Sequence, residues 1–94
     1  MTNYIKVKDN TLPLRINKAM DKIGDMLPGF YTRSGEVIIP KGAVSRVFRD
    51  NLVDVTHGET EFVRGCQASG WDVEERRVGS FLFKQCFVLT GKEN

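Results

Sequence analysis

The segment from Phe81 to Thr90 restricts the fold more than any other, because it is apolar on both sides of an extended strand. Alternate side chains of a strand point to opposite faces of a sheet. One side carries Phe81, Phe83, Phe87 and Leu89, and the other carries Leu82, Cys86 and Val88. A strand of this kind is usually central in its sheet or covered on both faces. We therefore expect a central or doubly covered strand near the C-terminus.

A partner strand precedes this segment. The run from Trp71 to Val78 is followed by Gly79-Ser80, which can supply the turn between two strands. We expect a long C-terminal hairpin, with residues 91–94 as a polar tail. A chain of 94 residues is short enough for one domain, so residues 1–94 are expected to share one core.

Two earlier segments show the helical spacing of apolar residues. From Leu12 to Leu27, apolar side chains fall on one side of a helix and charged side chains take the opposite side. Pro28-Gly29 ends this helix. A second helix is expected over about Ala43 to Asn51, and its apolar side comprises Ala43, Val44, Val47, Phe48 and Leu52.

Shorter strands are expected around these helices. The alternation from Tyr4 to Lys8 predicts a half-buried strand. The runs Phe30–Thr32 and Val37–Ile39 flank a turn at Ser34-Gly35 and predict a hairpin. The residues that we expect in the core are Ile16, Met20, Ile23, Val37, Ile39, Val47, Phe48, Phe83 and Phe87.

Residues 52–69 allow two interpretations. In the first, two strands join through a two-residue turn at His57-Gly58, where Gly tolerates the positive φ that such turns need. In the second, Thr56 and Glu59 form a capping box at the start of a third helix that ends at Gly70. The Val and Thr content favours strands, so the hairpin is preferred.

These elements predict an α+β fold, in which two helices pack on an antiparallel sheet of β-hairpins. The runner-up is a winged-helix-like arrangement of three helices plus a hairpin, which requires residues 52–69 to be helical. Helix, strand, helix, helix and hairpin is the element order of a winged helix.

The sequence contains no constellation of residues typical of an enzyme. His57 is the only histidine, and the glycine beside it indicates a turn rather than a catalytic base. One His, two distant Cys and scattered carboxylates have no recognised metal-binding spacing, and no phosphate-binding glycine motif is present. We therefore expect no catalysis, no metal and no cofactor.

The charge pattern favours a protein partner over a nucleic acid. The formal net charge of +2 comes from 14 basic and 12 acidic residues whose signs are interspersed. Nucleic-acid-binding domains usually carry a stronger basic excess. Glu59 and Glu61, near the start of a third helix, would also repel phosphates. The candidate binding residues are Tyr31, Arg46, Arg49, Arg64, Arg76, Arg77 and Lys84.

The expected function is that of a small non-catalytic regulator or inhibitor that binds a protein, such as a phage or plasmid accessory protein. The alternative is a small nucleic-acid-binding regulator with a basic face of scattered arginines. No hydrophobic signal core or membrane-spanning segment is visible, so we expect a cytoplasmic protein without a membrane role. In that compartment, Cys66 and Cys86 are expected to be free thiols.

Overall fold

A computed structural model describes residues 12–79 and 84–91 of the chain. The helices and strands, in chain order, are α1 (Leu14–Met26), the 3-10 helix η1 (Leu27–Phe30), β1 (Val37–Pro40), α2 (Lys41–Asp50), α3 (Val55–Ala68), β2 (Trp71–Val78) and β3 (Lys84–Gly91). Among these described elements, no helix is both long and apolar enough to cross a lipid bilayer.

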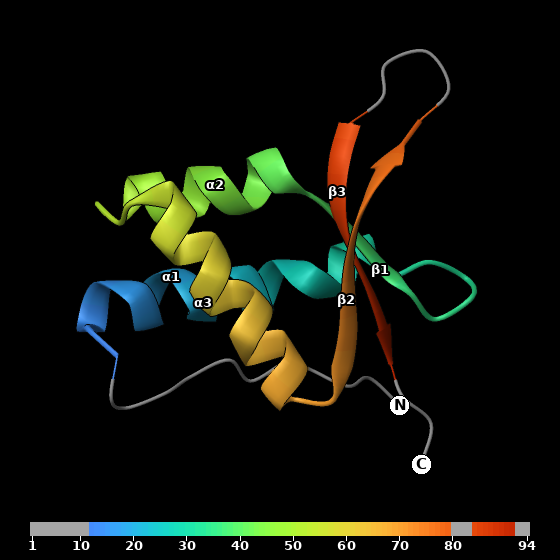
Figure 1. Cartoon of the computed structure of the whole chain (residues 1–94), viewed down its shortest axis with the longest axis horizontal. Coiled ribbons are helices and arrows are strands. Elements are labelled where there is room, and N and C mark those ends of the chain that lie inside the picture. The colour runs from blue at the N-terminus through green and yellow to red at the C-terminus, as the bar shows by residue number, and fades with distance from the viewer. Residues whose placement is uncertain (1–11, 80–83, 92–94) are drawn as a thin grey trace.

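The strands form an antiparallel sheet in the order β1-β3-β2, and the helices lie to one side of it (Figure 1). The α+β class is therefore confirmed. β3 lies between the other two strands, as the apolar character of both its sides predicts. Phe87 and Leu89 face the helices, while Cys86 and Val88 occupy the alternate, outer positions and are also buried.

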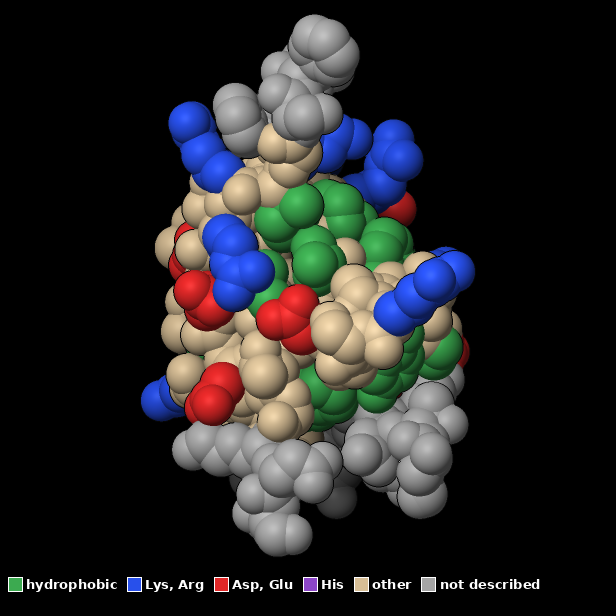
Figure 2. All heavy atoms as spheres, turned by 90° about the vertical axis from the view of Figure 1, so that its right-hand side faces the viewer, with side chains coloured by type: hydrophobic (Ala, Val, Ile, Leu, Met, Phe, Trp, Pro, Cys, Tyr) green, Lys and Arg blue, Asp and Glu red, His purple; other side chains and the backbone are tan. Residues whose placement is uncertain are grey.

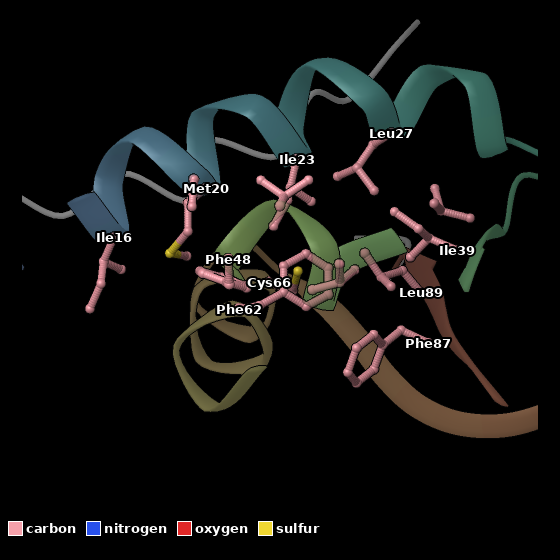
Figure 3. Packing of buried hydrophobic residues seen from close by; sticks show 14 of the residues in the cluster. Ile16, Met20, Ile23, Leu27, Ile39, Phe48, Phe62, Cys66, Phe87 and Leu89 are labelled. Carbon is pink, nitrogen blue, oxygen red and sulfur yellow. The ribbon is translucent and has the colours of Figure 1, made fainter. Parts of the chain in front are cut away.

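The core lies between the helices and the inner face of the sheet. Side chains of α1 point toward Phe48 of α2 and Phe62 of α3, and the apolar residues of β1 and β3 close the far side (Figure 3). Phe62 and Phe87 pack with their ring centroids 5.3 Å apart. The predicted core residues within the described ranges are all buried, namely Ile16, Met20, Ile23, Val37, Ile39, Val47, Phe48 and Phe87.

The preferred hairpin over residues 52–69 is wrong, because most of this segment is the helix α3. Phe62 is fully buried while Thr60 and Arg64 are exposed. A strand would place all three on one face, whereas a helix places the two polar residues opposite Phe62. The preference of Val and Thr for strands is weak, and the burial of Phe62 in the core outweighs it.

The start of α3 also differs from the predicted capping box. Asp54 is the N-cap residue, and its carboxylate accepts a hydrogen bond of 3.0 Å from the backbone amide of His57. The helix therefore begins before Thr56, and Glu59 is free to interact elsewhere. Gly70, with φ of 95°, follows the helix as its expected stop.

The element order of the described residues is that of the runner-up, winged-helix-like arrangement: helix, strand, helix, helix and hairpin. The predicted first hairpin is smaller than expected: Phe30 belongs to η1, and within the described part of the chain Tyr31 pairs with β1 through a single bridge to Val37. Gly35, with φ of 87°, forms the turn between them. The predicted strand at Tyr4–Lys8 and the expected core residue Phe83 lie outside the described residues.

Cys66 and Cys86 are free and buried in this structure. Cys66 lies on the side of α3 that faces the core, and burial raises the pKa of its thiol to about 12. Cys86 lies on the outer side of β3, so the sheet separates the two sulfurs.

We expect neither cysteine to react with a thiol reagent at pH 8 while the protein is folded. The raised pKa of Cys66 keeps its thiol protonated, and because both side chains are buried, a reagent reaches either one only through local or global opening. The measurement is mass spectrometry after alkylation, with and without denaturant. Two labels on the denatured, unreduced protein are expected, and a mass lower by two hydrogens with no label would contradict free thiols.

Candidate interaction surface

The outward face of α3 is rich in side chains that can form hydrogen bonds. Thr56, His57, Thr60, Arg64 and Gln67 are all exposed. Their exposure follows from the helical period, because the opposite side of α3 is buried against the core through Gly58, Phe62 and Cys66. Arginine, glutamine and threonine are residue types that contact both phosphates and base edges.

The two carboxylates of α3 that would repel phosphates are each engaged by a neighbouring side chain. Glu59 Oε2 accepts a hydrogen bond of 2.9 Å from Ser45 Oγ of α2, so this side chain points toward the neighbouring helix. Only 12% of the Glu61 side chain is exposed, and it lies 3.5 Å from Arg64 Nη1. These contacts reduce the repulsion that the two carboxylates would exert on phosphates.

Lys41, the first residue of α2, contacts side chains of α3, β2 and β3. Its ammonium donates a hydrogen bond of 2.8 Å to Glu75 Oε1 of β2 and lies 3.8 Å from Glu59 Oε1. The hydrogen bond to Glu75 is the main cause that raises the pKa of Lys41 above its ordinary value. The same ammonium is 5.4 Å from the ring centroid of Phe87, within the range of a cation–π contact. These contacts link α2 to α3 and to the sheet.

A groove of about 310 Å³ runs between α3 and the sheet. One wall belongs to α3 and comprises Thr56, Glu59, Thr60, Val63 and Arg64. The other wall belongs to the sheet and comprises Glu75 and Phe87. The lining is therefore mixed, with the apolar residues Val63 and Phe87 among polar and charged ones. A concave surface beside an exposed helix can accommodate the edge or the backbone of a larger ligand.

The basic residues of the C-terminal hairpin divide between two faces. Arg77 is on the same face as Glu75, toward α3, because two residues separate them along β2. Arg76 and Lys84 are on the outer face of the sheet. Arg76 is also engaged, since its Nη2 lies 2.6 Å from Glu74 Oε1. Figure 2 shows this sheet side of the molecule, where apolar side chains gather among Lys and Arg side chains.

The structure brings together only part of the predicted binding set. Arg64 and Arg77 lie on elements that border the groove, whereas Arg46 and Arg49 are exposed on α2. Tyr31 is half-buried, and its ring centroid is 6.3 Å from that of Trp71, so it serves packing at least as much as binding. The sequence reasoning missed Thr56 and Thr60, which become outward-facing only once residues 55–68 are helical.

A second unusual surface lies at the turn between α2 and α3. The amides of Leu52 and Val53 donate to the carbonyls of Arg49 and Phe48, at 3.0 and 2.9 Å, which is the pattern of a Schellman motif. Leu52 occupies the left-handed position with φ of 60°. Glycine is usual there, and a residue with a Cβ atom costs about 1–2 kcal/mol.

Leu52 is also 80% exposed, and Leu14 in the first turn of α1 is 70% exposed. The sequence pattern assigned Leu52 to the apolar side of the second helix, four residues after Phe48. That assignment is wrong because α2 ends at Asp50, and the chain turns before Leu52 can reach the core. In the sequence, such a residue can be distinguished from a core leucine only if the end of the helix is known.

Comparisons with protein-family models, with curated proteins and with solved structures find no match to this chain. Within the described ranges, no three His, Cys, Asp or Glu side chains converge to hold a metal ion. Two surfaces of the described residues are candidate binding sites: the outward face of α3 with its groove, and the surface around Leu14 and Leu52.

Proposed function

We propose that this chain is a small non-catalytic regulator that acts in the cytoplasm and binds duplex DNA through the outward face of α3. This proposal rests on the observation that the face presents Thr60, Arg64 and Gln67 to solvent, while Glu59 accepts a hydrogen bond from Ser45 and Glu61 pairs with Arg64. An exposed helix that follows a helix and a short turn can enter a major groove.

The C-terminal hairpin supports this proposal. Arg77 lies on the same face of β2 as Glu75, which lines the groove, and is two residues closer to the hairpin turn. A positive side chain in this place suits the phosphate backbone. The element order of a winged helix adds an analogy of fold, which by itself does not establish function.

The net charge of +2 sets the expected strength of this binding. Few phosphates can be neutralised, so we expect an affinity for random sequence in the range of about 10⁻⁴–10⁻⁶ M near physiological salt. The affinity is expected to fall with added salt. Tighter binding to a particular sequence requires the hydrogen bonds of α3 to base edges.

The test is a titration of labelled random duplex DNA against the parent and against Arg64→Glu and Arg77→Glu. Each substitution replaces a phosphate contact by a repulsion, so we expect each to weaken binding by about tenfold or more and to flatten the salt dependence. Circular dichroism checks that each variant remains folded.

Arg76→Glu is the matched control, because it makes the same charge change at the next residue but on the opposite face of β2. We expect it to leave DNA binding nearly unchanged. Equal losses for Arg76→Glu and Arg77→Glu would indicate a non-specific charge effect. A parent that does not bind duplex DNA, or that prefers single strands, would contradict the proposal.

A protein partner remains the second candidate function. The observation that favours it is the pair of exposed leucines, Leu14 and Leu52, on a surface distinct from the outward face of α3. Large apolar side chains clustered on a surface indicate a place where another molecule can bind. A regulator can use both surfaces.

A further inference from the structure

The surface around Leu14 and Leu52 combines a protruding group with a hollow. A hollow of about 520 Å³ lies between the start of α1 and the end of α2. Its lining comprises Pro13, Leu14, Arg15, Lys18, Asp50, Asn51 and Leu52. We call these seven residues the leucine patch.

Leu52 is unfavourable in this position for two independent reasons. Its backbone has the left-handed conformation that suits glycine, and its side chain is exposed rather than buried. The strained turn is held in place, because Arg15 Nη1 donates a hydrogen bond of 3.2 Å to the carbonyl of Leu52. Strain that the surrounding structure maintains is characteristic of functional sites.

The leucine patch also carries charges of both signs. Arg15 and Lys18 come from α1, and Asp50 comes from the last turn of α2. A partner for this surface needs an apolar group for the hollow, a recess for Leu52 and charges of both signs. The patch itself has each of these features, so a second copy of the chain can supply all of them.

We propose that the leucine patch is a two-fold interface between two copies of this chain. A two-fold axis pairs the same surface of both molecules, so each contact occurs twice. Leu52 of each copy enters the hollow of the other, and Asp50 faces the second copy's Lys18. The small size of the patch fits a weak, concentration-dependent dimer rather than an obligate one. This inference does not depend on DNA binding.

The experiment is sedimentation velocity over a concentration series that reaches about 1 mM, where a weak dimer is populated. We expect the parent to shift from monomer to dimer along the series. Leu52→Gly should raise the dimer dissociation constant by at least about tenfold, because it removes the group that fills the hollow. Its unfolding midpoint should be equal to or higher than that of the parent, because glycine relieves the left-handed backbone.

A charge exchange tests the predicted pairing. Asp50→Lys and Lys18→Glu should each weaken the dimer, because each places like charges opposite one another, and the double variant should restore it. Arg64→Glu, outside the patch, should leave the dissociation constant unchanged. A parent that stays monomeric throughout, a dimer insensitive to Leu52→Gly, or a double variant without recovery would each overturn the proposal.

Discussion

Phe87→Ala is expected to lower the free energy of unfolding by about 3–5 kcal/mol, through lost transfer energy and the cavity left behind. Phe87 lies on the central strand, is 1% exposed and packs against the ring of Phe62. Its neighbours belong to the sheet and to two helices, so they cannot collapse easily into the space. This loss is a large part of the total stability of about 5–15 kcal/mol that is typical of a domain. Urea unfolding followed by circular dichroism measures it.

Phe30→Ala is the matched control for this substitution. Phe30 is the same residue type, but it lies in η1 and is only partly buried against the core. We expect a loss of about 1–2 kcal/mol there, in proportion to the smaller apolar area removed from water. Equal losses at the two positions would contradict the central placement of Phe87.

Long and strongly patterned elements could be predicted from the sequence. Apolar residues on both faces of β3 predicted a central strand. The helical spacing of apolar residues in α1 predicted the buried face that carries Ile16, Met20 and Ile23. Each pattern extends over many residues, so several buried positions indicate the same type of element. Their ends were less accurate, since the second helix begins at Lys41 rather than near Ala43.

The segment around α3 could not be predicted, because its local and tertiary preferences disagree. Val, Thr and Gly65 disfavour a helix, whereas the burial of Phe62 and Cys66 on one side stabilises it. The same error concealed the candidate binding surface. Thr60 lies beside Arg64 on an outward face only when the segment is helical, and Glu59 turns toward Ser45 only when α2 is its neighbour.

Gly58 shows a second reason why the sequence was ambiguous. A glycine after His57 suggested the positive φ of a hairpin turn, but Gly58 lies inside α3. It is needed there because α2 and α3 approach closely. A Cβ atom at Gly58 would lie 2.5 Å from Cγ of Phe48. Close approach and positive φ both select glycine, and the sequence alone does not distinguish them.

Gly58→Ala is therefore expected to destabilise the protein, because overpacking of a core costs about 1–3 kcal/mol. The ring of Phe48 is 0% exposed and the predicted contact involves its first ring atom, so the ring cannot swing aside. Ala normally brings a gain of about 1 kcal/mol over Gly inside a helix, so we expect a net loss of up to about 2 kcal/mol. Chemical denaturation measures the sign and the size of the change.

Gly42→Ala provides the matched control, because it makes the same substitution in a helix where the new methyl group has nothing within 4 Å. Gly42 is exposed in the first turn of α2, so only the helix preference of Ala should act, and we expect a gain of up to about 1 kcal/mol. Opposite signs at the two glycines would locate the effect in the contact with Phe48. If Gly58→Ala were also stabilising, α2 and α3 could not pack as closely as described, and the position of the outward face of α3 would have to be revised.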